Sequence, residues 1–293
     1  MEIAPFYETE SGTWTYLLSD TRTLSAAIID PVWVYDPVSG TTDSAFMDQI
    51  LEHARQRDLA IEWVLETHAH ADHLTAAGEV RRRTGARIAC GKGICFVQET
   101  FARVFGIEEM AIDGRQFDRL LEEGDVINLG DLEIRVIETP GHTSDSVTYL
   151  VGDAAFVGDT LFAPNYGTAR CDFPGGDAGQ LYDSICRIYG LGDDTRIFLC
   201  HDYPGAGEQP SCQISVAESR TTNIHLRTET TRDEYVAMRT ARDAQLGLPR
   251  LIMPSLQVNI RAGEAPPADE NGVTYLKTPF NRAIADLINT ESE

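Results

Sequence analysis

The chain has 293 residues, 42% of them hydrophobic and 24% charged, which is the composition of an ordinary globular protein. Its net charge of −22 argues against nucleic acid and anionic membranes as partners, because both would be repelled. The sequence has no apolar run of the roughly 20 residues that cross a bilayer, and its first residues lack the pattern of a secretory signal. We therefore expect a cytoplasmic protein without nucleic-acid or membrane partners.

The first part of the chain alternates short apolar runs with turn residues. Residues 14–18 and 26–30 are rich in β-forming side chains and end at turn signals, so we predict two neighbouring strands there. A helix is predicted over residues 44–57, because Phe46 and Ile50 recur on one helical face. The next predicted elements are a strand at 61–65, a helix at 76–83 and a strand at 87–89.

From residue 125 the pattern turns mainly to strands, which glycines interrupt. The predicted elements are strands at 131–137, 146–151 and 154–157, a helix at 179–188, a strand at 196–199 and a helix at 215–227. Two sheets with helices on their outer faces form an αβ/βα sandwich of four layers. We predict this α/β fold, with the polar residues that follow the strands gathered along one edge.

The last part of the chain has a different pattern. An amphipathic, charge-rich helix is predicted over 232–246, an apolar extended segment over 249–261 and a loop over 264–271. We interpret residues 1–230 as the main domain. Residues 231–293 are expected to pack on this domain rather than to fold independently.

Four separate segments carry histidine or aspartate side chains just past predicted strands. They are Thr67–His73 with His68, His70, Asp72 and His73, Pro140–Thr143 with His142, Val157–Thr160 with Asp159, and Cys200–Tyr203 with His201. Five of the seven histidines of the chain lie in these segments. Imidazole and carboxylate groups are ligands that zinc and iron prefer, so the sequence predicts a metal-dependent enzyme.

This set resembles the metal site of the metallo-β-lactamase superfamily, and two ways of using it stay open. In the plan of that fold, His68, His70 and His142 hold one metal, Asp72, His73 and His201 hold another, and Asp159 bridges them. A mononuclear site would use only His68, His142 and Asp159, a face of two histidines and one carboxylate that suits ferrous iron. The remaining donors would then orient the ligands and hold water.

Several motifs around the donors resemble those of bacterial persulfide dioxygenases, also called sulfur dioxygenases. The segments that carry the resemblance are Thr67–Thr75, Gly158–Phe162, the loop Gly167–Phe173, His201-Asp202-Tyr203 and the tail Pro254–Gly263. Hydroxyacylglutathione hydrolases usually have H-E-Y where this chain has H-D-Y. The resemblance implies one Fe²⁺ per chain on His68, His142 and Asp159, and a homodimer. A cysteine of the human branch is replaced here by Thr168, so no role of that thiol is carried over.

The resemblance also suggests residues around the metal. Tyr203 and Asp72 are the candidate catalytic side chains, and Tyr203 is expected to donate a hydrogen bond to the substrate sulfur or to oxygen. Arg170 is expected either to bind a carboxylate of glutathione or to hold its loop through Asp172. The substrate-binding candidates on the predicted helix 215–227 are Arg220, Asn223 and Arg227, spaced i, i+3, i+7. We interpret Cys171 and Cys200 as small buried residues.

The function that follows is oxidation of glutathione persulfide by O₂ to sulfite and glutathione. The main alternative is a hydroxyacylglutathione hydrolase with two Zn²⁺ ions, because every ligand that such an enzyme needs is present. Another hydrolase of the same fold, such as a lactonase, and a metal-binding regulator without activity are further alternatives. Metal content and oxygen consumption separate these possibilities.

Overall fold

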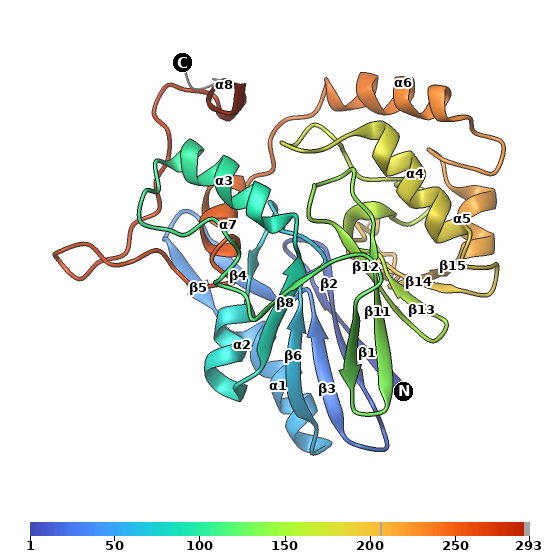
Figure 1. Cartoon of the computed structure of the whole chain (residues 1–293), viewed down its shortest axis with the longest axis horizontal. Coiled ribbons are helices and arrows are strands. Elements are labelled where there is room, and N and C mark those ends of the chain that lie inside the picture. The colour runs from blue at the N-terminus through green and yellow to red at the C-terminus, as the bar shows by residue number, and fades with distance from the viewer. Residues whose placement is uncertain (206, 290–293) are drawn as a thin grey trace.

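Two six-stranded β-sheets pack face to face and carry helices on their outer faces (Figure 1). The computed structural model of the protein describes residues 1–205 and 207–289. The first sheet has the order β1 (Glu2–Glu8), β2 (Thr13–Ser19), β3 (Ser25–Ile29), β6 (Ala60–Leu65), β8 (Arg87–Gly91) and β9 (Arg119–Leu121). The second has the order β10 (Val126–Leu129), β11 (Leu132–Glu138), β12 (Val147–Val151), β13 (Ala154–Phe156), β14 (Arg196–Phe198) and β15 (Gln213–Ser215). A small third sheet joins β5 (Thr41–Asp43), β4 (Val32–Asp36) and β7 (Leu74–Thr75).

Three clusters of buried apolar side chains give the layer order. The cluster between the sheets includes Tyr16, whose ring centroid lies 5.2 Å from that of Phe156 and 5.4 Å from that of Phe198. A second cluster lies under helices α1 (Ala45–Gln56), α2 (Ala77–Thr84) and α3 (Ile94–Phe105). A third lies under α4 (Ala178–Tyr189), α5 (Val216–Thr222) and α6 (Arg232–Asp243). The predicted αβ/βα sandwich is confirmed.

The sequence patterns locate the regular elements best where polar and apolar positions alternate clearly. The strands predicted at 61–65 and 196–199 and the helices predicted at 44–57 and 179–188 agree with the structure to within one residue at each end. Helix α3 was not predicted. Most of its side chains are buried, so its sequence shows no polar face from which a helical period can be read.

Two predicted elements of the C-terminal half are wrong in part. The segment 249–261 is not extended, because Ile252–Asn259 form helix α7. Pro254 lies in the first turn of α7, where its missing N–H costs no hydrogen bond, and nearly all the side chains of the helix are buried, so no polar stripe marks it. The helix predicted over 215–227 ends already at Thr222.

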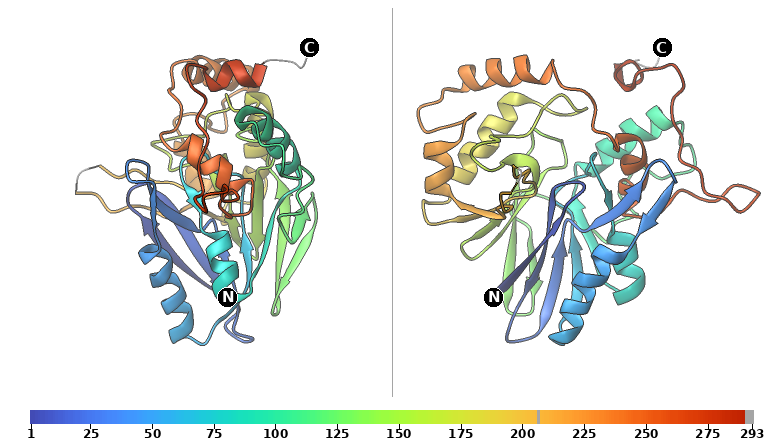
Figure 2. Two further views of the ribbon diagram at one scale, coloured as in Figure 1. Left: turned by 90° about the vertical axis from the view of Figure 1, so that its left-hand side faces the viewer. Right: turned by 180° about the vertical axis from the view of Figure 1, so that it is seen from behind.

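The C-terminal elements lie against both halves of the sandwich, in orange and red in both views of Figure 2; in Figure 1, α6 and α8 lie at the top and α7 lies below α3. Helix α6 packs on α4, and α7 packs on α3 and β7. The final helix α8 (Ile284–Asn289) also contacts α3. Residues 290–293 of the predicted C-terminal segment lie outside the described residues.

In the described part of the chain, no helix has the length and apolar character that crossing a membrane requires.

One side chain of α7 ties the C-terminal segment to the histidine-rich loop. The amide nitrogen of Asn259 donates to the backbone oxygens of His70, at 2.7 Å, and of His73, at 2.9 Å. Its oxygen accepts a hydrogen bond from the backbone N–H of Thr75 at 2.8 Å. Asn259 is buried, so these three bonds have no water to replace them. They fix the backbone on which the predicted metal ligands stand.

We therefore predict that Asn259→Ala destabilises both the fold and the metal site. Each buried backbone group left without a partner costs about 1–3 kcal/mol, so the free energy of unfolding should fall by several kcal/mol. Metal affinity should fall by roughly 10–100-fold, as for other losses of ligand support. Denaturant titration and metal competition measure the two effects. Asn128→Ala, at an exposed asparagine of β10, is the control and should change neither. Unchanged metal affinity in Asn259→Ala would refute the clamp.

Candidate metal centre

The predicted donors come together at one edge of the two sheets. His68, His70, Asp72 and His73 follow β6, His142 follows β11, Asp159 lies in the short 3₁₀ helix Gly158–Thr160 after β13, and His201 follows β14. Strands β13 and β14 pair in parallel, so the segments that follow them emerge at the same edge. This arrangement explains why donors separated by more than 130 residues in sequence lie in contact.

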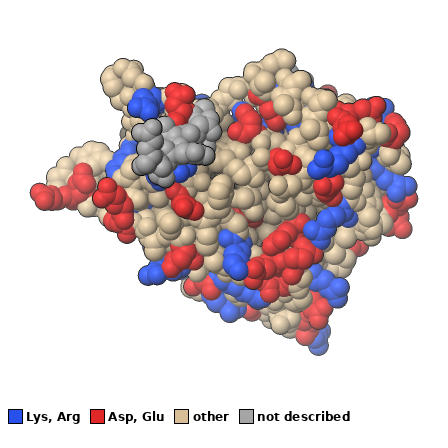
Figure 3. All heavy atoms as spheres, turned by 45° about the horizontal axis from the view of Figure 1, so that its top comes forward, with Lys and Arg blue, Asp and Glu red and all other residues tan. Residues whose placement is uncertain are grey.

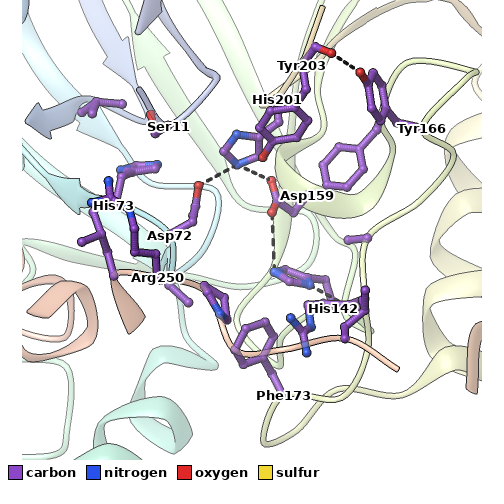
Figure 4. A pocket seen from close by; sticks show the side chains of 18 of the residues that line it. Ser11, Asp72, His73, His142, Asp159, Tyr166, Phe173, His201, Tyr203 and Arg250 are labelled. Atoms are coloured by element: carbon purple, nitrogen blue, oxygen red, sulfur yellow. Dashed lines mark hydrogen bonds and ion pairs between the residues drawn. The ribbon is translucent and has the colours of Figure 1, made fainter. Parts of the chain in front are cut away.

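The three residues of the predicted mononuclear site form a compact group. The ligand atoms of His68, His142 and Asp159 lie within 4.8 Å of one another. Oδ2 of Asp159 is 3.6 Å from Nε2 of His142 and 3.9 Å from Nε2 of His68. Its other oxygen, Oδ1, lies 3.3 Å from Nε2 of His201. The carboxylate of Asp159 therefore stands between the mononuclear group and the remaining donors (Figure 4).

The second set of donors is divided in a different way from the dinuclear expectation. Asp72 and His73 fall in a group with His70, whereas His201 falls in a group with His70 and Cys200. Nε2 of His201 is nevertheless only 3.3 Å from Oδ2 of Asp72. Asp72 and His201 thus contact each other, although they fall in different groups. By contrast, His68, His142 and Asp159 form a single group whose imidazole and carboxylate ligands come from three different loops.

Hydrogen bonds to Nδ1 orient four of the histidine rings. Nδ1 of His142 lies 2.7 Å from the backbone oxygen of Arg170, and Nδ1 of His73 lies 3.1 Å from that of Leu74. Nδ1 of His68 contacts Oγ1 of Thr67 at 3.1 Å, and Nδ1 of His201 lies 3.3 Å from the backbone oxygen of Gly12. Anchoring one ring nitrogen to a protein oxygen is the usual support of a metal-ligating histidine, because it directs the other nitrogen at the ion.

The inward atoms satisfy a direct test for a metal. Nε2 of His68, His73 and His201 and one oxygen each of Asp72 and Asp159 are buried, yet none accepts or donates a hydrogen bond among the described residues. Buried polar atoms without partners are rare and costly in native proteins. A cation held by His68, His142 and Asp159 would give Nε2 of His68 a partner, whereas the other unpartnered atoms lie on the side of Asp72, His73 and His201. The residues present therefore fit a metal ion of the kind that nitrogen and oxygen donors bind.

The protonation states also fit metal binding. Burial and the nearby ring of His70 hold the pKa of His68 well below its usual value, and the same causes lower the pKa of His73 to about 4. Burial would raise the pKa of Asp159, but the surrounding imidazoles, His201 first, hold it well below its usual value. Neutral imidazoles and an ionised carboxylate are the forms that bind metals.

His201 behaves differently because it lies between two carboxylates. Burial lowers its pKa, but the charges of Asp159 and Asp72 outweigh burial and raise the pKa to about 9. Without a metal, this imidazole would hold a proton that balances the two acids. A cation bound at Asp159 would take over that role and release the proton.

A buried acidic pair behind His70 was missed by the sequence analysis. Nε2 of His70 lies 3.1 Å from an oxygen of Asp30 and 3.9 Å from an oxygen of Glu66. Asp30 also accepts hydrogen bonds from the backbone N–H and the hydroxyl of Thr67, at 2.8 and 2.9 Å. His70 therefore directs Nε2 at the two acids, and its Nδ1 is buried without a hydrogen-bond partner among the described residues. The one sequence signal for Asp30 is its place at the end of an apolar strand.

A cavity of about 450 Å³ opens beside the donors. It exposes Asp72, His73, His142, Asp159 and His201 on its floor. Its walls come from β4, from the loop after Asp159 and from the segment between α6 and α7, and they include Trp33, Tyr35, Phe162, Tyr166, Phe173 and Leu246. A largely apolar cavity with a few polar groups at one end is the usual form of a small-molecule site.

Tyr203 and Arg170 both line this cavity, but only Tyr203 has a free polar group there. The ring of Tyr203 stacks on that of His201, with centroids 5.8 Å apart and planes at 7°. Nε and Nη2 of Arg170 each donate to Asp172 at 2.6 Å, and Nη1 donates to the backbone oxygen of Gly247 at 2.7 Å. Of the two predicted roles of Arg170, the structure therefore favours holding the loop.

The three residues predicted on one helical face lie elsewhere. The helix ends at Thr222, so Asn223 and Arg227 do not continue the face of Arg220. Arg220 pairs with Asp193 at 2.8 Å, and Arg227 donates to the backbone oxygen of Asn223. Asn223 is buried and donates to the backbone oxygen of Gly167. None of the three lines the cavity, so the geometry gives no support to their predicted contact with a tripeptide.

Comparison with known proteins places these features in a family. Residues 27–201 match the metallo-β-lactamase superfamily, which is more than half of the chain. The chain belongs to this superfamily. The motif His68-x-His70-x-Asp72-His73 lies within the matched residues, and the predicted resemblance to the metallo-β-lactamase superfamily is confirmed.

Relatives of this metallo-β-lactamase superfamily protein carry names of different activities. It is 46% identical to a probable metallo-hydrolase of Burkholderia pseudomallei, over 96% of this chain and 99% of the relative. It is 45% identical to a β-lactamase hydrolase-like protein of Agrobacterium fabrum and spans 64% of the length of that relative. It is also 30% identical to the mitochondrial persulfide dioxygenase of Bos taurus, over 89% of each chain. The crystal structure of ETHE1 from Myxococcus xanthus superposes with a TM-score of 0.72 at 31% identity, over 90% of this chain and 100% of that one.

Replacing Asp159 should disable the site whichever metal it holds. Asp159→Ala removes the carboxylate common to the mononuclear and dinuclear alternatives, so bound metal and turnover should both be lost. Metal analysis of the purified variant and an activity assay test this. A variant that keeps its full metal content and turnover would show that the assignment of the site is wrong.

His73 separates the two alternatives. If His73 is a ligand in a dinuclear site, His73→Ala should lose one of two metals. If the site is mononuclear, the variant should keep about one iron per chain, while activity falls roughly 10–100-fold because the surroundings of the ligands are disturbed. Parallel metal analysis of wild type and variant decides. Two metals in the wild type and one in the variant would contradict the mononuclear site.

Proposed function

We propose that the protein is a persulfide dioxygenase that binds one Fe²⁺ and oxidises glutathione persulfide with O₂ to sulfite and glutathione. The observation that carries the proposal is the compact group of His68, His142 and Asp159, which lies beside a cavity large enough for a tripeptide derivative. Two histidines and one carboxylate leave positions open for further ligands on an octahedral iron. The similarity to the mitochondrial persulfide dioxygenase of Bos taurus over 89% of each chain supports the same activity.

The reaction balances with water as the third reactant. The S–S bond of the persulfide breaks, the terminal sulfur loses four electrons and O₂ gains four. Two of the oxygens of sulfite come from O₂ and the third comes from water. Ferrous iron in the site supplies the redox chemistry that lets O₂ react with a persulfide. The protein has to bind the substrate, exclude other reactions and provide protons.

Tyr203 is the proton donor that the cavity offers for this reaction. Partial burial, and after it the carboxylates of Asp72 and Asp159, raise the pKa of Tyr203 above its usual value, so the phenol keeps its proton at neutral pH. Its stacking on His201 holds the ring beside the metal ligands. We infer that the hydroxyl hydrogen-bonds to the substrate sulfur and supports the thiolate that leaves as glutathione.

Asp72 has a second role in this proposal. Its carboxylate lines the cavity and contacts His201 without belonging to the mononuclear group. We infer that Asp72 and His201 hold the water that the reaction consumes, since both have a buried polar atom without a partner. A carboxylate and an imidazole in contact can act together as a general base, so the pair is suited to accept the protons that this water releases.

A dinuclear zinc thioester hydrolase is the second candidate, and specific observations favour it. All seven donors are present, and the chain is 42% identical to Glyoxylase B2 of Dictyostelium discoideum, over 96% of this chain and 97% of that protein. The probable metallo-hydrolase of Burkholderia pseudomallei points the same way by name. A hydrolase would need Asp72, His73 and His201 to hold a second ion.

An oxygen electrode separates the two functions. We expect oxygen uptake with glutathione persulfide, none with glutathione alone because it lacks a sulfane sulfur, and no cleavage of S-lactoylglutathione. Metal analysis of the same preparation should give about one iron per chain. Cleavage of S-lactoylglutathione without oxygen uptake, together with two zinc ions per chain, would reverse the ranking in favour of the hydrolase.

A further inference from the structure

The basic side chains of this acidic protein are nearly all neutralised by a partner. On the face shown in Figure 3, basic and acidic side chains lie side by side. Many of the surface side chains form ion pairs, for example Arg83 with Asp48, Lys92 with Glu122 and Arg187 with Glu123. Among the described residues, four arginine side chains form neither a hydrogen bond nor an ion pair. They are Arg87, whose guanidinium group lies over the ring of Trp63, and Arg242, Arg250 and Arg282. Of these four, Arg242 and Arg250 line the cavity of the metal centre.

Both arginines belong to the segment that closes one side of the cavity. Arg242 lies in the last turn of α6 and Arg250 just before α7, and between them Leu246 and Pro249 contribute apolar wall. Figure 4 shows Arg250 on the side of the cavity where Asp72 and His73 lie. The side chain of Arg170 crosses to this segment and donates to the backbone oxygen of Gly247. Arg170 is therefore a positioning residue, and its positive charge is neutralised by its ion pair with Asp172.

The absence of ion pairs at Arg242 and Arg250 is unexpected in such an acidic protein. The protein carries a net charge of −22, and acidic groups that could pair with an arginine are abundant on its surface. The effect of the unpaired charge is visible on a neighbour: burial, and after it the charges of Arg239 and Arg242, lower the pKa of His225 to about 4. His225 also lines the cavity, so its wall is electropositive next to α6. Arg239 itself is buried and paired with Asp243.

We propose that Arg242 and Arg250 form a carboxylate-binding subsite that recognises the tail of the thiol substrate. The ligand class is a small thiol derivative with two carboxylates, as in glutathione, whose sulfur end reaches the metal ligands. A guanidinium group binds a carboxylate through two parallel hydrogen bonds, and neither Arg242 nor Arg250 would have to break a hydrogen bond or an ion pair to do so. The proposal rests on the proposed function only for the position of the substrate sulfur near the metal ligands. The carboxylates of the substrate would be recognised in the same way in a persulfide and in a thioester of glutathione.

Binding of an unreactive analogue tests the subsite without any chemistry. Calorimetry on the metal-loaded protein compares S-methylglutathione with its diethyl ester, in which both carboxylates are masked. We expect the wild type to bind the acid more tightly than the ester. The double variant Arg242→Gln/Arg250→Gln should bind the acid roughly 10–100-fold more weakly, as expected for loss of hydrogen bonds to charged groups, and should bind the ester as the wild type does. Arg282→Gln is the matched control, since it removes an unpaired arginine outside the cavity, and its affinities should equal those of the wild type.

Kinetics give a second reading of the same variants. With glutathione persulfide, the double variant should show a higher KM and a nearly unchanged kcat, because the contacts to the tail are the same in ground state and transition state. Arg242→Lys/Arg250→Lys should recover part of the affinity, since it restores the charge but not the paired geometry. In the wild type, affinity for the acid should fall as salt is added, and the double variant should lose this dependence.

The outcomes distinguish this subsite from the proposed reaction. Equal affinity of wild type and double variant for S-methylglutathione would overturn the subsite, even if oxygen uptake is normal. Equal weakening for the acid and the ester would also overturn it, because the arginines would then only shape the wall. Selective loss of the acid, in a protein that takes up no oxygen with glutathione persulfide, would support the subsite and overturn the dioxygenase.

Discussion

The buried carboxylate of Asp159 is the constraint on which the rest of the site depends. It lies within 4 Å of the Nε2 atoms of His68, His142 and His201, at the floor of the cavity and largely shielded from solvent. A buried charge must be balanced by a partner of opposite sign. Here burial holds the pKa of His68 well below its usual value, so this imidazole is neutral and does not balance the charge. A cation bound at Asp159 would supply this balance, and the hydrogen bonds at Nδ1 of His68, His142 and His201 direct the other ring nitrogens toward Asp159.

The support for the metal ligands comes from parts of the chain far apart in sequence. Asp30, at the end of β3, holds His70 and both polar groups of Thr67. Asn259, at the end of α7, holds the backbone of His70 and His73 from the opposite side. The C-terminal segment is therefore part of the metal centre as well as its cover. Its second contribution, the arginines beside the cavity, comes from the same stretch of chain, so one segment both stiffens the ligands and faces the substrate.

The candidate ligands could be recognised in the sequence because their chemistry and spacing are local. His68, His70, Asp72 and His73 lie within six residues, and the remaining donors each follow a strand that alternates apolar and polar positions. The supporting residues could not be found in this way. Asp30 and Asn259 are ordinary polar residues, and only the packing of β3 and α7 against the loop gives them partners. The fold was predicted in its layers, but α3 and α7 were missed because burial on most sides hides the helical period.

Substrate contacts are the least predictable part for a related physical reason. Arg220, Asn223 and Arg227 have the spacing of one helical face, yet Asn223 ends the helix by bonding to other backbone groups. The spacing carried no information once the helix stopped. Arg170 lines the cavity, but it cannot bind a ligand carboxylate without losing hydrogen bonds, because its N–H groups already donate to Asp172 and Gly247. A charged side chain can bind a ligand only with donors that the protein has left free. Among the arginines that line the cavity that condition selects Arg242 and Arg250, because Arg170 and Arg239 are paired with Asp172 and Asp243.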